Sequence, residues 1–185
     1  MTTFAFVFPG QGSQTVGMLD GWGDRPAVRD TLAEASDALG VDIGQLIHEG
    51  PKDQLDLTTN TQPVMLAAAV ACYRAWMAET GLAPAVVAGH SLGEYSALVA
   101  AGSLTLADAL PLVRFRAQAM QEAVPVGVGA MAAILGLEAE IVRVTCAEVA
   151  AAVGEPVEAA NFNDPKQIVI AGTKGAVDQA CEALK

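Results

Sequence analysis

Two short apolar runs in the first half of the chain are followed by turns rich in small residues. Phe4–Phe8 is apolar at every position and ends at Pro9, a pattern typical of a central strand buried in a parallel sheet. Ala85–Ala88 is a second such run, and a helix-like segment follows it up to Ala101. Strands that alternate with helices predict an α/β fold built on a parallel sheet.

Helical patterns dominate the rest of the sequence up to residue 123. The segment Pro26–Leu39 places its apolar residues on one face, as an amphipathic helix does. Thr61 can cap a second helix, with Pro63 in its first turn, that runs to residue 80. A third helix is predicted over 105–123, where Pro111 indicates a kink or a later start.

The pattern changes after a hinge-like stretch rich in glycine, valine and proline at 124–129. Beyond it the order is strand, helix, strand, strand, helix, which is a split βαβ, ferredoxin-like arrangement without its last strand. We therefore expect two parts, residues 1–126 with the parallel sheet and residues 127–185 as a small ferredoxin-like subdomain.

The acidic composition excludes some partners. The net charge is −11, so the chain is not expected to bind nucleic acid. No apolar run reaches the roughly 18 residues of a membrane span, and no basic segment typical of a signal peptide begins the chain. The three widely spaced cysteines, without a CxxC motif or a histidine cluster, predict buried thiols in a reducing compartment and no metal site.

The strongest candidate for chemistry is the sequence Gly89-His90-Ser91-Leu92-Gly93. It lies between a predicted strand and a predicted helix, where a sharp turn pushes the Ser91 side chain clear of both elements. Glycines two residues before and after the serine allow backbone segments to crowd together. A serine held in this way can act as a nucleophile if a base takes its proton and donors bind the oxyanion.

A glycine-rich turn, Pro9–Gln14, follows the first strand and suggests a nucleotide site at first sight. The spacing excludes that function, because GxGxxG needs glycine at Thr15 and GxxxxGK needs lysine at Met18. Two interpretations remain open: a tight loop without function, or a turn that brings Gln11 close to a site.

Local sequence says less about four other polar residues. Gln62 at the start of the second long helix is best explained as part of its cap. Arg114 and Arg116 point to different helix faces, so one should reach solvent and the other can be half-buried against a carboxylate, although two solvated arginines are the favoured local interpretation. His48 precedes Glu49-Gly50-Pro51 and is expected at a solvated helix end.

Taken together, the motifs resemble malonyl-CoA:acyl carrier protein transacylases of bacterial fatty acid synthesis. The resemblance covers the whole chain and rests on residues in a fixed order: Phe6-Val7-Phe8-Pro9-Gly10-Gln11-Gly12-Ser13-Gln14, Thr61-Gln62-Pro63, Gly89-His90-Ser91-Leu92-Gly93-Glu94-Tyr95, Arg116, Met120-Gln121-Glu122-Ala123-Val124-Pro125 and Asn161-Phe162-Asn163. It implies an α/β-hydrolase-like core with an inserted ferredoxin-like subdomain, both incomplete at the C-terminus.

The resemblance also implies a two-step transfer in the cytoplasm that needs no cofactor. Ser91 would attack malonyl-CoA, the backbone N–H groups of Gln11 and Leu92 would bind the oxyanion, and acyl carrier protein would accept the malonyl group. Arg116 would pair with the malonyl carboxylate and so exclude acetyl groups. Three further residues would line the pocket: Gln62, Met120 and Asn161.

One departure from the family pattern concerns the general base. The family uses a histidine after the serine, whereas the two histidines of this chain are His48 and His90, and His90 belongs to the turn itself. We therefore expect the chain to be the first part of a longer enzyme, with little transferase activity alone. A serine hydrolase or thioesterase, a fragment that only binds carrier protein, and a polyketide-type acyltransferase remain alternatives.

Docking of an acidic carrier protein to an acidic chain requires a local basic patch. The candidates all lie in the predicted small subdomain: Lys166, Lys174 and Lys185.

Overall fold

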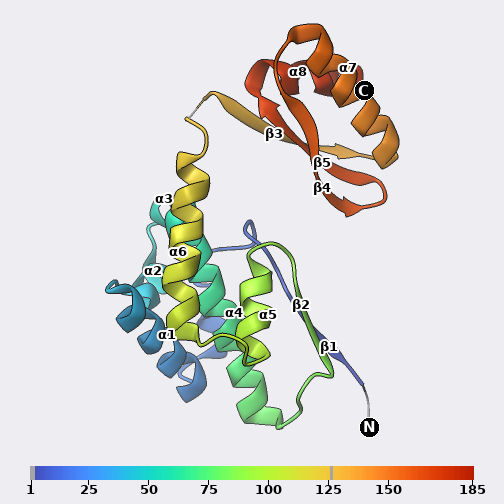
Figure 1. Cartoon of the computed structure of the whole chain (residues 1–185). Helices are drawn as coiled ribbons and strands as arrows, with labels where there is room; N and C mark the ends of the chain where they lie inside the picture. Colours follow the sequence, from blue (N-terminus) through green and yellow to red (C-terminus); the bar gives the residue numbers. More distant parts are fainter. Residues whose placement is uncertain (1–2, 126) are drawn as a thin grey trace. The chain divides into compact units, whose positions relative to one another are not determined.

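The computed structural model describes residues 3–125 and 127–185, which form two compact units, Met1–Gln121 and Glu122–Lys185 (Figure 1). Unit 1 contains a two-stranded parallel sheet and most of the helices. Unit 2 contains a three-stranded antiparallel sheet and two helices. The expected α/β class, with a parallel sheet in the first part and an antiparallel sheet in the second, is confirmed. The units separate between Gln121 and Glu122, five residues before the boundary expected from the hinge-like sequence.

Unit 1 is built around one long central helix. Its elements are β1 (Ala5–Phe8), a 3-10 turn (Asp20–Trp22), α1 (Pro26–Leu39), α2 (Ile43–Glu49), α3 (Lys52–Leu55), α4 (Thr58–Thr80), β2 (Val86–Gly89), α5 (Gly93–Ala100) and α6 (Leu106–Glu122). The first half of α4 is buried on nearly all sides, because alanines and other small side chains let neighbouring helices pack closely against it. Leu66 and Ala71 of α4 and Leu110 of α6 are fully buried in this core.

Two details of the helices differ from the expectations. Helix α4 begins at Thr58, one turn before Thr61, whose hydroxyl donates to the Leu55 carbonyl at 2.5 Å and does not cap the helix. Helix α6 begins at Leu106 and continues through Pro111, so the later start is wrong. Thr105 supplies the cap for α6, since its hydroxyl oxygen accepts from the Asp108 amide.

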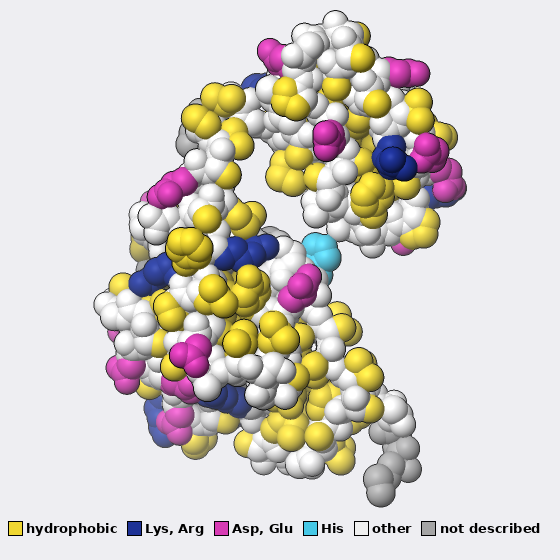
Figure 2. All heavy atoms as spheres, in the orientation of Figure 1, with side chains coloured by type: hydrophobic (Ala, Val, Ile, Leu, Met, Phe, Trp, Pro, Cys, Tyr) yellow, Lys and Arg dark blue, Asp and Glu magenta, His cyan; other side chains and the backbone are white. Residues whose placement is uncertain are grey.

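The parallel sheet of unit 1 is less buried than its apolar sequence suggests. Strands β1 and β2 pair in register from Ala5 with Val86 to Phe8 with Gly89. Phe8 is buried, but Val7 and Val86 are 72% and 61% exposed, so the expectation of a strand buried on both faces is wrong in this structure. Figure 2 shows hydrophobic side chains on the surface of both units.

Unit 2 has the element order β3 (Gly129–Leu135), α7 (Ala139–Val153), β4 (Val157–Asp164), β5 (Gln167–Thr173) and α8 (Lys174–Ala183). Strand β5 lies between β3 and β4 and is antiparallel to both. The two helices cover one face of this sheet, where Ile168 and Ile170 of β5 are fully buried. The alternating pattern of β5 therefore decides which face of the sheet forms the core.

Candidate active site

Ser91 occupies a strained turn between β2 and α5. Its φ is 54°, and among the described residues it is the one non-glycine residue with a positive φ. Holding a serine in the left-handed region costs about 1–3 kcal/mol, so the surrounding contacts must impose this conformation. The conformation leaves the Ser91 side chain exposed at the end of the strand, as the sharp-turn hypothesis predicts.

The glycines on both sides of Ser91 are required by close backbone contacts. A Cβ on Gly89 would lie 2.0 Å from the carbonyl carbon and oxygen of Gly93, and a Cβ on Gly93 would lie 2.2 Å from the Phe8 oxygen. No side chain fits at such distances. The turn is thus pressed against the end of β1, and the His90 amide continues the pairing by donating to the Phe8 carbonyl at 3.1 Å.

The glycine-rich turn after β1 lies directly beside the Ser91 turn. A Cβ on Gly10 would meet the backbone oxygen and Nδ1 of His90 at 3.1 Å. The next residue, Gln11, accepts a hydrogen bond on its side-chain oxygen from Gln62 Nε2 at 3.4 Å. Of the two interpretations of this turn, the structure therefore favours the one that places Gln11 close to the site.

Two backbone amides near Ser91 are available for an oxyanion. Within residues 3–125 and 127–185, neither the Gln11 amide nor the Leu92 amide donates a hydrogen bond to another residue. Leu92 precedes the first residue of α5, where backbone N–H groups lack partners inside the helix. The assignment of both amides to an oxyanion hole stays a prediction.

Arg116 on α6 is the cationic group at Ser91. Its Nη2 donates to Ser91 Oγ at 2.9 Å, and its Nη1 donates to the Gln62 side-chain oxygen at 2.6 Å. The guanidinium carbon lies 5.9 Å from the centre of the Tyr95 ring. Arg116 is half-buried and held on several sides, so the expectation of a solvated arginine is wrong here.

Arg114 differs from its solvated interpretation as well, because its Nη1 donates to the Leu39 carbonyl at 2.9 Å. This contact joins α6 to the end of α1 and lies away from Ser91 in the contact network. The two arginines, two positions apart, therefore serve different parts of unit 1.

Gln62 connects three site residues through one buried amide. It is fully buried in α4, its oxygen accepts from Arg116, and its nitrogen contacts Gln11 Oε1 and, at 3.5 Å, the sulfur of Met120. A buried amide that has partners on both atoms is fixed in orientation. The cap role expected from local sequence is wrong, since α4 begins four residues earlier.

Two further residues that the sequence singled out are Asn161 and His48. Asn161 is exposed on β4 of unit 2, where it pairs with Val169, and its role in a malonyl pocket stays a prediction. His48 lies in the last turn of α2 and its Nδ1 lies 2.5 Å from Asp20 Oδ1, in agreement with a partly solvated helix end. No group of three or more metal-ligating side chains occurs among the described residues.

The cysteines do not offer a competing nucleophile. All three are free thiols, and Cys146 is buried while Cys72 and Cys181 are half-buried. Burial raises the pKa of the Cys72 and Cys146 thiols above the ordinary value, which disfavours the reactive thiolate. Ser91 is therefore the better candidate for acyl transfer.

Tyr95 was not singled out by the sequence as a site residue, although it lies against Arg116. The available signal was its spacing, because a residue four positions after Ser91 lies on the same side of the helix that follows the turn.

Comparisons with known proteins identify the family of the chain. Residues 5–185 match the family model described as "Acyl transferase domain". The chain belongs to this acyl transferase domain family. It is 56% identical over 186 residues to the malonyl CoA-acyl carrier protein transacylase of Escherichia coli strain K12, and 46% identical over 186 residues to that of Bacillus subtilis strain 168.

Solved structures of family members have the same fold. The acyl-carrier-protein S-malonyltransferase of Burkholderia pseudomallei superimposes with a TM-score of 0.94 at 67% identity, covering 99% of this chain. A malonyl-transacylase solved in complex with a type II polyketide acyl-carrier protein superimposes with a TM-score of 0.93 at 51% identity. The chain spans about 60% of the length of these relatives, with 60% for the Escherichia coli protein and 59% for both structures.

Proposed function

We propose that this chain carries the acyl-accepting part of an acyltransferase that moves a malonyl group from malonyl-CoA to the phosphopantetheine thiol of acyl carrier protein. The observation that carries the proposal is the pairing of a serine in a strained turn with an arginine at 2.9 Å from its hydroxyl oxygen. The names of the family members support the same substrates, because they are called malonyl CoA-acyl carrier protein transacylases.

In the first step the Ser91 oxygen attacks the thioester carbonyl carbon of malonyl-CoA. The serine proton passes to a general base and then to the departing sulfur of coenzyme A, and malonyl-Ser91 forms. The Gln11 and Leu92 amides bind the negative oxygen of the tetrahedral intermediate. In the second step the carrier-protein thiol attacks the same carbonyl and returns the proton to Ser91 Oγ.

Neither histidine of the chain is assigned to the general base. His48 contacts Asp20 on α2, and His90 precedes Ser91 in the turn and packs against Gly10. We therefore propose that the base belongs to a longer protein. The purified 185-residue chain is expected to transfer malonyl groups far more slowly than the full-length Escherichia coli relative, and equal rates would contradict this.

Arg116 supplies the preference for malonyl over acetyl groups. Its planar guanidinium can bind the free malonyl carboxylate through two parallel hydrogen bonds. An acetyl group would leave this half-buried cation without a carboxylate partner, which costs binding energy at the site. Gln62 fixes one edge of the guanidinium through the 2.6 Å hydrogen bond, and Met120, which contacts the Gln62 amide, is proposed to line the same pocket.

We also propose the finer fold description in this context. Unit 1 would belong to an α/β-hydrolase-like core, with Ser91 on the turn after a parallel strand. Unit 2 has the strand order β3-β5-β4 and two helices on one face. It would correspond to a ferredoxin-like subdomain that has three of its four strands.

One observation supports a carrier-protein partner, and another weakens the proposed docking residues. A relative is described as a malonyl-transacylase in complex with its acyl-carrier protein, which supports a carrier-protein partner for this chain. However, the three lysines proposed for docking already contact carboxylates: Lys166 with Glu138, Lys174 with Asp178 and Lys185 with Glu182. Their positive charge is therefore partly compensated within unit 2.

No described helix is long and apolar enough to cross a membrane, and cytoplasmic action remains a prediction.

Mass spectrometry of the intact chain after exposure to malonyl-CoA tests the function. We expect a malonyl adduct on Ser91 that a carrier-protein thiol removes, and no adduct with Ser91→Ala. An adduct lost quickly to water would favour a serine hydrolase or thioesterase. The absence of any adduct would favour a fragment that only binds carrier protein.

A further inference from the structure

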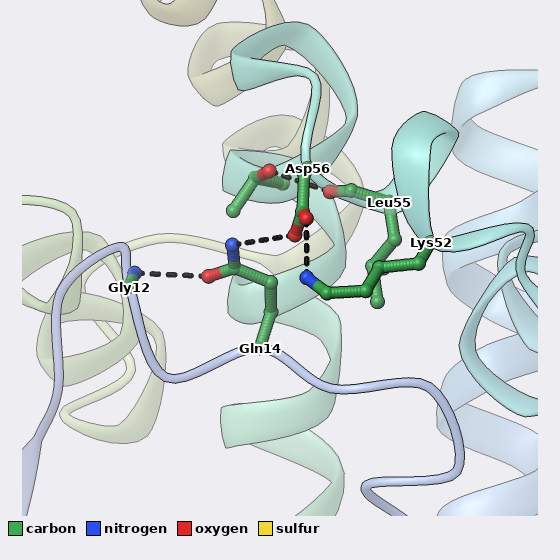
Figure 3. A network of polar contacts seen from close by, with 6 residues as sticks. Gly12, Gln14, Lys52, Leu55 and Asp56 are labelled. Atoms are coloured by element: carbon green, nitrogen blue, oxygen red, sulfur yellow. Dashed lines mark hydrogen bonds and ion pairs between the residues drawn. The ribbon is translucent and has the colours of Figure 1, made fainter.

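A chain of polar contacts joins the glycine-rich turn to the segment between α3 and α4, and the proposed reaction does not use it (Figure 3). The Gly12 amide donates to the Gln14 side-chain oxygen at 2.9 Å, and the Gln14 side-chain nitrogen donates to Asp56 Oδ1 at 3.0 Å. The Lys52 ammonium group pairs with the other oxygen of the Asp56 carboxylate. Residues 12 and 14 follow β1, whereas Lys52 begins α3 and Asp56 directly follows it.

The chemistry of Asp56 decides how the Gln14 amide is oriented. An ionised carboxylate only accepts hydrogen bonds, so the Gln14 NH₂ group must face it and the Gln14 oxygen must face the Gly12 amide. Hydrogen bonds from Lys52 and Gln14 lower the pKa of Asp56 below its ordinary value, which favours the ionised carboxylate. The orientation of the Gln14 amide is thereby fixed from one side.

The Gly12 amide belongs to the peptide unit that links Gln11 to Gly12. Because a peptide unit is planar, a hydrogen bond to this N–H restricts the rotation of the chain at Gln11. Gly12 has a φ of 120°, which favours glycine, and glycine gives the loop much conformational freedom. An anchor at this point therefore limits the directions in which the neighbouring Gln11 amide can point.

The other contacts of this turn are longer. The Gln11 side chain accepts from Gln62 at 3.4 Å and donates to Thr58 Oγ1 at 3.5 Å, both at the limit for a hydrogen bond. The two contacts of Gln14 are of ordinary length, and one of them ends on a charged acceptor, which strengthens it. By distance and charge, Gln14 is the stronger anchor of the turn.

We propose that Gln14, oriented by Asp56 and Lys52, is a positioning residue that directs the Gln11 backbone N–H toward the oxyanion formed at Ser91. This inference rests on the proposed function, since it assigns a cause to the placement of one oxyanion donor. Gln14 touches neither substrate nor Ser91 in this role and acts through the backbone of the turn.

The decisive variant is Gln14→Glu. It keeps the length of the side chain and an oxygen for the Gly12 amide, but it places a carboxylate against Asp56, and two like charges repel. In the double variant Gln14→Glu/Asp56→Asn the donor and acceptor are exchanged, because the asparagine NH₂ group can donate to the glutamate and its oxygen can accept from Lys52. The net charge of the double variant equals that of the wild type.

Gln45→Glu is the matched control. Gln45 Nε2 donates to Glu49 Oε2 at 3.2 Å on exposed α2, so this substitution also places a carboxylate against a carboxylate in unit 1. It does not touch the glycine-rich turn. Any general effect of added charge or of repulsion on the surface appears in this control.

The first measurement is hydrogen exchange of the Gly12 amide by NMR, which needs no substrate. Gln14→Glu is expected to speed this exchange about 10-fold, or about 1.4 kcal/mol, because repulsion from Asp56 displaces the residue 14 oxygen from the Gly12 amide. In the double variant the exchange rate of the Gly12 amide should return to within about 3-fold of the wild-type rate. Gln45→Glu should leave this exchange rate unchanged. Unchanged exchange in Gln14→Glu would overturn the proposal.

The second measurement is the rate at which malonyl-CoA acylates Ser91, at saturating and at limiting concentrations. Removing an oxyanion donor lowers the rate of the chemical step about 100-fold to 1,000-fold. Misdirecting the donor should therefore lower the saturated rate about 10-fold to 100-fold. The half-saturating concentration should stay within about 2-fold, and the double variant should recover the rate. A fall in the saturated rate without recovery in the double variant, or faster exchange with an unchanged rate, would overturn the positioning role. Complete absence of acylation in the wild type, in place of the slow acylation expected without the general base, would instead count against the proposed function, whatever the exchange shows.

Discussion

The sheets of the two units differ in what they bury. In the parallel pair of unit 1, Phe8 alone has a buried side chain, and Val7 and Val86 are exposed. In the antiparallel sheet of unit 2, Ile134, Val157 and the two isoleucines of β5 are buried under α7 and α8. The sheet of unit 2 forms one side of the hydrophobic core of that unit, whereas the core of unit 1 lies among its helices.

The apolar burial of the unit 2 sheet and the candidate site of unit 1 therefore depend on different kinds of contact. The strands of unit 1 contribute little apolar burial, yet their ends hold the Gln11 and Ser91 turns in contact through backbone atoms. Side-chain packing therefore governs the stability of unit 2, and close backbone contact governs the geometry of the candidate site in unit 1. Four experiments would test this contrast.

The largest effect is expected from the core of the unit 2 sheet. Ile170→Ala removes a fully buried side chain and should lower the free energy of unfolding by about 3–4 kcal/mol, because a cavity remains. Val7→Ala in the unit 1 sheet, at a position 72% exposed, should change it by about 0.5 kcal/mol or less. Urea denaturation followed by circular dichroism measures both, and equal effects would remove the contrast between the sheets.

The next effect concerns the backbone contact behind Ser91. Gly93→Ala would force a Cβ to within 2.2 Å of the Phe8 oxygen and should cost about 3 kcal/mol, together with loss of Ser91 acylation. Gly175→Ala in α8 is the control, since its nearest neighbour is a side-chain atom at 3.8 Å. Alanine favours helix over glycine, so the control should be neutral or stabilising by about 0.5 kcal/mol. A tolerated Gly93→Ala would show that the close contact is not required.

A smaller effect is expected for substrate choice. Arg116→Ala should lower the preference for malonyl-CoA over acetyl-CoA about 30-fold, or about 2 kcal/mol, as measured by competing acylation of Ser91. Arg143→Ala in unit 2 removes an exposed arginine that pairs with Glu140 and should leave the preference unchanged. An unchanged preference in Arg116→Ala would show that another group binds the malonyl carboxylate.

The smallest effects are opposite pH dependences of two exposed ion pairs. The pKa of Asp56 in unit 1 is lowered by hydrogen bonds from Lys52 and Gln14, so its contribution to stability is present above the unfolded pKa and is lost as pH falls through the folded pKa. The pKa of Lys174 in unit 2 is raised by Asp178, so its contribution is present below the unfolded pKa and is lost as pH rises through the folded pKa.

Melting temperatures across the pH range, compared with Asp56→Asn and Lys174→Met, measure these two contributions. The difference between wild type and Asp56→Asn should shrink in acid, and the difference between wild type and Lys174→Met should shrink in alkali. Differences that do not change with pH would mean that the two pairs do not affect stability.

Much of the fold was predictable because the apolar pattern is local information. The 3.6-residue period indicated α1 with its correct bounds, and the order of elements in unit 2 followed from alternation and turn residues. The errors occur where tertiary contacts override local rules. Thr61 has the sequence of a cap, but its hydroxyl finds the Leu55 carbonyl, and helix α4 extends one turn further back.

The candidate site was predictable to a different degree. Ser91 could be identified from its turn sequence, since glycines at fixed spacing indicate a crowded backbone. The roles of Gln62 and Arg116 could not be assigned from local residues. The site is formed by four separate segments that only the fold brings together, and these carry Gln11, Gln62, Ser91 and Arg116. The role proposed for Gln14 depends on Asp56, 42 positions away.

The amino-acid sequence was enough to predict most elements of both units, the sharp turn at Ser91 and, through the resemblance of its motifs, the acyl transferase family. These depend on residues close together in the chain, whose spacing limits the backbone directly. Only the tertiary structure decided that Arg116 reaches Ser91, that Gln62 is buried between Gln11 and Arg116, and that β1 exposes Val7. Hydrogen-bond partners and burial depend on distances between separate elements, and packing of the whole unit sets those distances.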